Sequence, residues 1–216
     1  MMTMSKKMRG TLAVISGFSG AGKGTVIKRL LEKHGDSYCL SVSATTRLPR
    51  DGEKEGVHYF FKTTAQFEQM IRENKFLEYA CYVNNYYGTP KAFVEEKLEA
   101  GIHVLLEIEI QGALNVKSQY PDALLLFITP PSAGELEKRL RGRGTETEEV
   151  IQGRLMRACE EAGEIKKYDY LVVNDDVDEC VEMVHKIICS ASDKVTNNSE
   201  FIDELSDGLR VFKKGE

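Results

Sequence analysis

A glycine-rich stretch between an apolar run and a helical pattern constrains this chain more than any other feature. Residues 12–16 predict a buried strand, while Val26, Ile27, Leu30 and Leu31 recur at helical spacing. Four glycines and a lysine lie between these two patterns. Glycines permit positive φ angles and close backbone approach, so successive N–H groups can point at phosphate oxygens, beside the positive end of the following helix. The stretch therefore predicts a phosphate-binding loop.

The lysine and the hydroxyl of this loop suggest separate tasks. Lys23 adds a compact charge that can reach the β- and γ-phosphates of a nucleotide. Gly24 stands where the general motif has Ser or Thr, so Thr25 becomes the nearest hydroxyl ligand for Mg²⁺. The alternative is a strand-to-helix turn without a ligand. The predicted nucleotide contacts are Gly17, Phe18, Ser19, Gly20, Ala21, Gly22, Lys23, Gly24 and Thr25.

Apolar runs alternate with helical patterns along the rest of the chain. Further strands are predicted at 39–43, 103–110, 123–129 and 170–173, and helices at 90–100, 132–140, 148–167 and 177–190. Continuous apolar strands separated by helices are typical of a parallel sheet that is covered on both faces. We therefore predict an α/β fold with an open, doubly wound, mostly parallel sheet of five strands.

Two segments break this alternation and suggest how the chain is divided. Residues 47–89 are polar and aromatic and predict a small inserted α+β unit with its own sheet, and residues 142–156 begin with a glycine-rich, charged stretch that predicts a mobile lid. The core is expected at 1–46, 90–141 and 157–194. The polar tail, 195–216, is left without a predicted fold.

Composition excludes several classes of protein. The chain has 216 residues and a formal net charge of −5, which disfavours nucleic acid as a partner. Its apolar runs are far shorter than the roughly 20 residues of a membrane-spanning helix, and no signal peptide pattern is present. The five cysteines lack Cys-x-x-Cys spacing and the four histidines fit no ligand pattern, so neither disulfides nor a zinc site is expected. A reducing cytoplasm is the simplest location.

Arginines are grouped along the sequence. Arg is preferred over Lys where a planar fork must hold two phosphate oxygens. Arg139, Arg143 and Arg154 suit a lid that closes over a transferring phosphoryl group. Arg141 and Arg157 are expected on a solvated helix face, paired with glutamates one turn away.

Four blocks of sequence carry a family resemblance. They are residues 17–25, 41–50, 85–89 and 139–148, and together with their spacing they resemble the guanylate kinases, which are nucleoside-monophosphate kinases. The resemblance covers about residues 10–192. It implies a P-loop kinase fold that transfers the γ-phosphoryl group of MgATP to GMP, giving ADP and GDP. The catalytic residues implied are Lys23, Arg139, Arg143 and Arg154, and Asn174 resembles the residue that contacts the adenine of ATP.

The same resemblance implies a GMP pocket. Guanine presents two donors on its pairing edge, and a carboxylate accepts both at once, so a wrong base leaves a partner unpaired. The implied GMP contacts are Ser43, Arg47, Arg50, Tyr59, Glu78, Tyr87, Thr89 and Glu109.

A second carboxylate lies close to Glu109 in the sequence. Glu107 and Glu109 are expected to project the same way from one strand, with Glu107 orienting water bound to Mg²⁺. General base catalysis is not expected, because the second pKa of the attacking phosphate of GMP is about 6 and the phosphate is therefore already largely ionised.

Two alternatives remain at this point. One is a non-catalytic, guanylate-kinase-like protein-binding module, which the presence of Lys23, Arg50, Arg139 and Arg143 disfavours. The other is a kinase of the same fold that acts on a different phosphorylated small molecule. The sequence leaves the choice between monomer and homo-oligomer open.

Overall fold

The computed structural model describes residues 9–82, 84–142, 144 and 146–213. Its main sheet has five parallel strands, which confirms the predicted fold class. In spatial order they are β2 (Tyr38–Leu40), β7 (His103–Glu107), β1 (Leu12–Gly17), β8 (Leu124–Thr129) and β9 (Tyr170–Val173). The buried, nearly continuous apolar sequence of β1 and β8 follows from their place inside a sheet covered on both faces.

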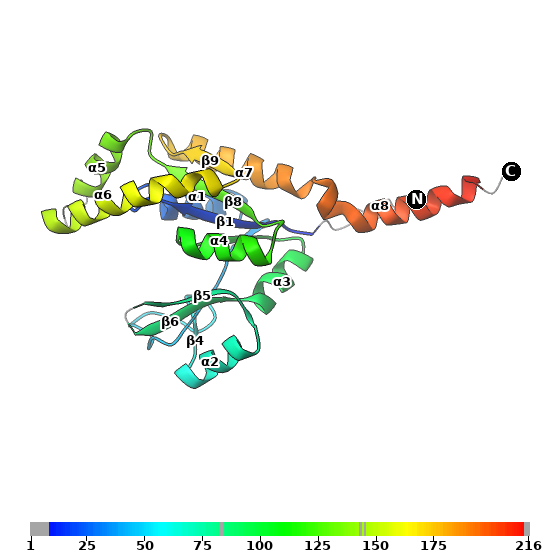
Figure 1. Cartoon of the computed structure of the whole chain (residues 1–216). Coiled ribbons are helices and arrows are strands. Elements are labelled where there is room, and N and C mark those ends of the chain that lie inside the picture. The colour runs from blue at the N-terminus through cyan, green and yellow to red at the C-terminus, as the bar shows by residue number, and fades with distance from the viewer. Residues whose placement is uncertain (1–8, 83, 143, 145, 214–216) are drawn as a thin grey trace.

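Helices cover both faces of the main sheet (Figure 1). On β1, Ala13 and Ile15 pack with α1 (Lys23–His34) and α7 (Val177–Ser192), whereas Leu12 and Val14 face the other core. That second core contains residues of α3 (Lys91–Glu99) and α4 (Ile110–Gln119). Alternate residues of one strand therefore serve two separate apolar layers.

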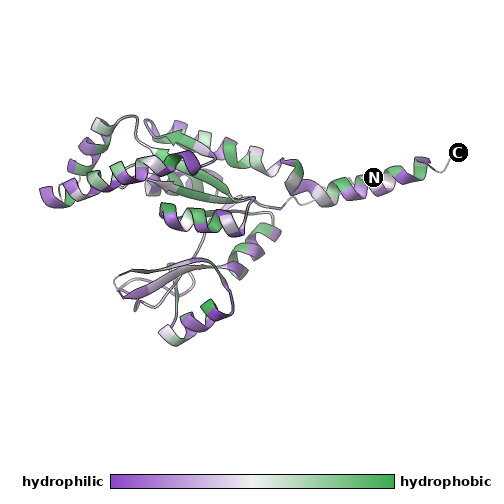
Figure 2. Ribbon diagram, in the orientation of Figure 1, coloured by the Kyte–Doolittle hydropathy of each residue, from purple (hydrophilic) through white to green (hydrophobic). Residues whose placement is uncertain are grey.

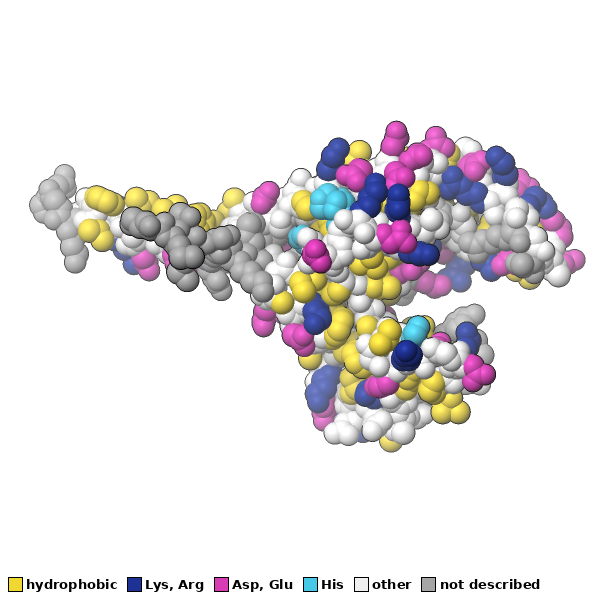
Figure 3. Space-filling model, turned by 180° about the vertical axis from the view of Figure 1, so that it is seen from behind, with side chains coloured by type: hydrophobic (Ala, Val, Ile, Leu, Met, Phe, Trp, Pro, Cys, Tyr) yellow, Lys and Arg dark blue, Asp and Glu magenta, His cyan; other side chains and the backbone are white. Residues whose placement is uncertain are grey.

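The inserted region forms a sheet of its own, one strand of which, at Ala44–Thr45, precedes the predicted bounds of residues 47–89. Its strands lie in the order β4 (Phe60–Phe61), β3 (Ala44–Thr45), β6 (Asn85–Pro90) and β5 (Phe76–Tyr82), with α2 (Thr64–Arg72) between β4 and β5 in the chain. The rings of Phe67 and Phe76 stack 4.3 Å apart in its small core. Figure 3 shows an open cleft between this insertion and the main body.

Two helices at the end of the sheet that bears the glycine-rich loop pack against each other. They are α5 (Ala133–Arg141) and α6 (Glu148–Ala162), and α6 continues into a 3-10 turn, η1 (Gly163–Lys167). Leu136, Leu140 and Ile151 form their shared apolar cluster, against which Phe18 of the loop packs. The pair is thereby attached to the loop.

Beyond α7 the chain forms a projecting tail. Its elements are η2 (Val195–Asn198), α8 (Ser199–Leu209) and η3 (Arg210–Lys213), and they point away from the rest of the molecule (Figure 1). Coloured by hydropathy, this tail carries both apolar and polar residues along its length (Figure 2). Among the described residues, no helix combines the length and apolar character needed to span a bilayer.

Several predicted boundaries were wrong. The strand predicted at 39–43 ends at Leu40, and the one predicted at 103–110 ends at Glu107, where the pairing of β7 with Ile15 of β1 stops. Glu109 is the N-cap residue of α4, a helix that the sequence did not suggest. Glu107 and Glu109 therefore do not share one strand, although both side chains line one cavity, which is described below.

Candidate nucleotide-binding site

The glycine-rich loop, residues 17–25, begins at the carboxyl end of β1 and ends in the first turn of α1. Gly20 and Gly22 have φ angles of 93° and 89°, which L side chains rarely adopt. A Cβ atom at Gly22 would also lie 2.5 Å from Nδ2 of Asn174. Glycine at these positions lets the loop fold tightly over the start of α1, as a phosphate-binding loop requires.

Lys23 lies at the start of α1, and its side chain turns back over the loop. Its Nζ donates to the carbonyl oxygens of Gly17 at 2.7 Å and Phe18 at 3.1 Å. The ammonium group is therefore held at the mouth of the loop, where the phosphates of a nucleotide would lie.

Asn174 follows β9 and is buried beneath the loop, with 3% of its surface exposed. Its Nδ2 donates to the carbonyl of Ala21 at 2.8 Å, and its Oδ1 has no hydrogen-bond partner within the described residues. In this conformation the side chain acts on the loop backbone. The adenine contact implied by the resemblance stays a prediction.

A cavity of about 490 Å³ opens beside the loop. It brings together Lys23 and two arginines of α6, Arg154 and Arg157. Glu107 and Glu109 form the acidic part of its wall. The cavity thus combines the cationic groups that phosphates require with two carboxylates.

Arg154 connects α6 to the loop. Its guanidinium donates to Oγ of Ser19 and, at 2.5 Å, to Oε1 of Glu146. Arg139 lies on α5 and pairs with Glu135 one turn earlier at 2.9 Å. Arg143, the third arginine predicted for the lid, lies outside the described residues.

The expectation for Arg157 was incomplete. It makes a pair of the expected kind, with Glu161 one turn away at 3.0 Å, but it also pairs with Glu109 at 2.5 Å in the cavity wall. Sequence reasoning assigned this residue to a solvated face, because helical spacing alone does not reveal that α6 passes beside the loop. Arg141 behaves as predicted, pairing with Glu137 at 3.0 Å.

A second cavity, of about 170 Å³, lies toward the insertion. Ser43, Tyr59 and Thr89 line it, and Glu107 and Ile108 lie in the walls of both cavities. The end of β7 therefore separates two adjoining spaces, one beside the loop and one beside the inserted sheet.

Glu78 lies on β5 directly opposite Thr89 of β6. The Thr89 hydroxyl donates to Oε1 of Glu78 at 2.7 Å, and Thr89 itself is fully buried. Burial raises the pKa of the Glu78 carboxyl, although the hydrogen bond from Thr89 opposes the shift. A half-buried carboxylate is an acceptor that suits a ligand bringing its own donors.

Basic and aromatic side chains of the insertion meet around Tyr59, which lines the smaller cavity. The guanidinium of Arg47 lies 5.4 Å from the ring centre of Tyr59, whose ring meets that of Tyr87 edge to face at 6.1 Å. Arg47 also pairs with Glu53 at 2.8 Å, and Glu53 accepts the backbone N–H of Arg50 at 2.8 Å.

Sequence reasoning missed Glu53. The Arg47 guanidinium and the Arg50 N–H together hold the pKa of Glu53 at about 2. This carboxylate therefore stays ionised and fixes the arginine-bearing loop. The spacing of Arg47, Arg50 and Glu53, three residues apart each time, is a signal that could have identified it.

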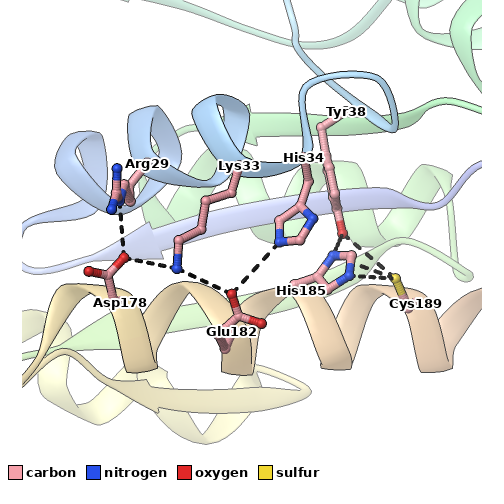
Figure 4. Close-up of polar contacts among 8 residues, drawn as sticks. All are labelled: Arg29, Lys33, His34, Tyr38, Asp178, Glu182, His185 and Cys189. Carbon is pink, nitrogen blue, oxygen red and sulfur yellow. Dashed lines mark hydrogen bonds and ion pairs between the residues drawn. The ribbon is translucent and has the colours of Figure 1, made fainter.

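A polar network holds α1 against α7 (Figure 4). Asp178 accepts from Arg29 at 3.0 Å and from Lys33 at 2.9 Å. The rings of His34 and His185 stack 3.9 Å apart, one from each helix. Since α1 carries Lys23 in its first turn, this network fixes the direction from which the lysine enters the loop.

Histidines far apart in the sequence meet at the end of this network. The hydroxyl of Tyr38 lies 2.8 Å from Nδ1 of His185, and the Tyr38 ring packs against His103 with centroids 5.0 Å apart. The part of the chain that the structure describes contains no group of three or more His, Cys, Asp or Glu residues suited to a metal ion.

Comparisons with known proteins bear on this site. A family model described as guanylate kinase matches residues 9–191. The guanylate kinase of Caldanaerobacter subterraneus subsp. tengcongensis is 52% identical over 197 residues, which are 91% of this chain and 95% of that protein. The guanylate kinase of Bacillus cereus is 46% identical over 204 residues, 94% and 100% of the two chains.

A solved structure agrees with these relatives. The crystal structure of guanylate kinase from Anaplasma phagocytophilum superposes with a TM-score of 0.66 at 30% identity, covering 88% of this chain and 91% of that one. The family match spans most of the chain and includes the glycine-rich loop, the inserted sheet and α6. The chain therefore belongs to the guanylate kinase family.

Proposed function

We propose that this protein is an ATP:GMP phosphotransferase, which moves the γ-phosphoryl group of MgATP to GMP and releases ADP and GDP. The observation that carries this proposal is the common wall of the two cavities at Glu107 and Ile108. A nucleotide on the loop and a second one against the inserted sheet would meet at this wall. Relatives that are about half identical to this chain are guanylate kinases, which supports the proposal.

The donor side uses the loop and the helices beside it. ATP contacts are proposed for residues 17–25, with Lys23 neutralising the β- and γ-phosphates and Asn174 supporting the loop from below. Arg139, Arg143 and Arg154 are the proposed groups that balance charge as it spreads over the moving phosphoryl group. The link from Arg154 to Ser19 supports this role, because it already brings α6 to the loop.

The acceptor side uses the insertion. Glu78 would accept both donors of the guanine edge, and Ser43 and Thr89 would supply hydroxyls to the rest of the base. Arg47, Arg50, Tyr59 and Tyr87 would hold the phosphate of GMP. The contact of Arg47 with the ring of Tyr59 supports this role, because Tyr59 meets Tyr87 and lines the smaller cavity.

Glu109 differs from the other proposed guanine contacts in its surroundings. It is exposed, caps α4, and pairs with Arg157 on the side of the loop. Contact with the base would require this ion pair to break or the insertion to move. We retain Glu109 as a proposed contact and note that its pairing favours the phosphate side of the cleft.

Magnesium fits the oxygen donors at the start of α1 and the end of β7. Thr25 is exposed in the first helical turn, and Glu107 is exposed in the cavity wall. Hydroxyl, carboxylate and water oxygens are the ligands that Mg²⁺ prefers. When bound, the ion would screen the negative charge of the phosphates, with Thr25 as a direct ligand and Glu107 acting through water.

Catalysis in this proposal rests on positioning and charge. The attacking oxygen of GMP is already ionised, so no side chain has to remove a proton from it. The protein's residues hold donor and acceptor in line and exclude water from the transferring group as the open cleft closes. The five cysteines are free thiols, which accords with the proposed cytoplasmic location.

The experiment that tests the proposal is an ADP-release assay with MgATP and each of GMP, AMP, UMP and CMP. Turnover with GMP alone, or far above the others, is the expected result. Activity with none of them would favour the non-catalytic binding module, and preference for another acceptor would favour the second alternative.

A substitution in the loop makes the assay specific. Lys23→Ala should lower kcat by about 10²–10³-fold while the melting temperature is retained, because one preorganised charge is lost from the transition state. Lys28→Ala is the matched control, since Lys28 lies one turn later on α1 with its side chain 80% exposed. Full activity in Lys23→Ala would refute the loop assignment.

A further inference from the structure

The tail helix α8 and the 3-10 segment η3 that follows it present an apolar seam that the proposed function does not use. Ile202, Leu205, Leu209 and Phe212 follow one another at spacings of three, four and three residues, which is the repeat of a helix that pairs with another helix. All four are among the exposed large apolar residues, and Phe212 is 82% exposed. The seam lies beyond residue 191, where the family match ends.

Hydrogen bonds at the start of the tail direct the seam away from the protein's own core. Nδ2 of Asn197 donates to the carbonyl of Ala191 at 2.7 Å, and Nδ2 of Asn198 donates to the carbonyls of Ser192 at 3.1 Å and Lys194 at 2.8 Å. These amide bonds cap the end of α7 and fix the turn between α7 and α8. The tail consequently projects from the body, as Figure 1 shows.

Charge is divided along the same helix. Glu200, Asp203 and Glu204 lie in the first half of residues 199–213 and Asp207 lies near its middle, whereas Arg210 and Lys213 follow in η3. Arg210 pairs with Asp207 of the same helix at 2.8 Å. An antiparallel neighbour of the same sequence would place its basic end beside this acidic half, and would also oppose the two helix dipoles favourably.

From this arrangement we propose that α8 and η3 form an antiparallel pair with the same segment of a second copy of this chain. A two-fold axis near residue 207 places Ile202 opposite Phe212 of the partner and Leu205 opposite Leu209 of the partner. Each apolar residue of the seam then meets another, so the face is complementary to itself, as a two-fold interface requires. Gly208 and Ser206 flank the seam and are small enough to let the helices approach closely.

A membrane surface is disfavoured as the occupant of this face. Between residues 199 and 213 there are four acidic and two basic residues, and anionic lipid headgroups would repel this net negative segment. The seam is also short, so the pair is a weak and concentration-dependent one. It lies at the end of the molecule opposite the lid helices α5 and α6, so pairing leaves the cleft open to nucleotides (Figure 1).

The mass of the full chain in solution tests this proposal. Sedimentation equilibrium from about 1 to about 100 μM should show the mass rising from 24.3 kDa toward twice that value. The double variant Leu205→Glu with Leu209→Glu should stay monomeric over this range, with unchanged ADP release. Val211→Glu is the matched control, because Val211 is an exposed apolar residue of the same segment that lies off the seam; it should dimerise as the parent does.

Cross-linking separates the antiparallel pair from a parallel one. In a background carrying Cys81→Ser and Cys159→Ser, which removes the two exposed thiols, Leu205→Cys and Leu209→Cys are each made singly. Oxidation of the two variants mixed should give a disulfide-linked dimer in at least several-fold greater yield than either alone. Cross-linking of each variant with itself would overturn the antiparallel arrangement.

Three other results would overturn the proposal. One is a wild-type chain that stays monomeric at every concentration, and another is a double variant that dimerises as well as Val211→Glu. The third is co-sedimentation of a monomeric wild-type chain with vesicles of phosphatidylserine and phosphatidylcholine. None of these outcomes depends on turnover, so they are distinguishable from failure of the proposed phosphotransferase activity.

Discussion

Asn174 donates its side-chain amide to the carbonyl of Ala21 at 2.8 Å, and so joins the residue that follows β9 to the middle of the phosphate loop. We expect Asn174→Ala to lower the stability by about 1–3 kcal/mol, because the buried carbonyl loses its partner. The KM for ATP should also rise, because the loop loses its support. Thermal unfolding and initial rates against ATP concentration measure the two effects.

Asn115→Ala provides the control for this change. Asn115 is exposed on α4 and bonds only weakly to Gln111, at 3.3 Å. If Asn174→Ala matched this control in both stability and KM, the link to Ala21 would have no role in holding the loop.

Glu78 provides a test of base recognition. Glu78→Gln should raise the KM for GMP by about tenfold or more and reduce the preference for GMP over AMP, because an amide presents a donor where guanine also has one. The measurement is kcat/KM for both acceptors. An unchanged ratio would mean that Glu78 does not read the base.

The raised pKa of Glu78 adds a pH dependence to that prediction. Burial moves its pKa above the usual 4.5, so protonation begins at a higher pH than for a free carboxyl. The proton removes an acceptor, so the KM for GMP should rise as pH falls toward this pKa. Glu78→Gln should lack this limb of the profile, whereas the KM for ATP should keep its own pH dependence in both proteins.

Arg154 should be sensitive even to lysine. Its guanidinium binds Ser19 and Glu146 at the same time, which a single ammonium group cannot reproduce. Arg154→Lys should therefore lower kcat by about tenfold or more, with a smaller change in the KM for GMP. Arg141→Lys, on the outer face of α5 where Arg141 pairs with Glu137 and Glu148, should leave both constants unchanged.

The histidine cluster predicts that stability falls in mild acid. Burial lowers the pKa of His103 and His185 below 6.5, so the unfolded chain takes up protons before the folded one does. The contribution of these histidines to the free energy of unfolding is therefore fully present above pH 6.5. It is lost as the pH falls from there. Asp178 and Glu182, whose pKa values are lowered from 3.8 and 4.5, contribute their own decline only in stronger acid.

Thermal unfolding from about pH 7.5 to about pH 5 measures this effect. His185→Gln should flatten the profile in that window, while His58→Gln should not, since His58 is exposed on the insertion. A profile that falls only below about pH 4.5 would show that the carboxylates alone control acid stability.

The sequence was a good guide wherever apolar periodicity or a loop motif governed the structure. The five strands of the main sheet, the inserted sheet and the loop before α1 were predicted because each is specified by neighbouring residues. Helix α4 was missed because its apolar residues follow directly on those of β7, and Gly112 looked like a stop signal. Only the end of pairing with β1 separates strand from helix there.

The missed site residues share one physical reason. Arg157 and Glu53 act through partners that helical spacing or local composition does not reveal, Glu109 in the first case and Arg47 in the second. The clustering of three histidines around Tyr38 is likewise a result of the packing of α1, α7 and β7. Contacts between elements that are distant in the chain could not be predicted from one sequence.

The small apolar core within the insertion has a consequence for how such an enzyme can evolve. Phe67 and Phe76 stack within the insertion, and Leu77 of β5 packs into the layer that contains α3 and α4. The layer that contains α1 and the loop residue Ala21 includes no residue of the insertion. Mutations that reshape the acceptor pocket are thereby thermodynamically insulated from the loop that handles the donor. Substitutions in the insertion would then change which monophosphate is accepted without disturbing the loop that binds the donor. The inserted sheet is therefore the place to begin redesigning acceptor selectivity.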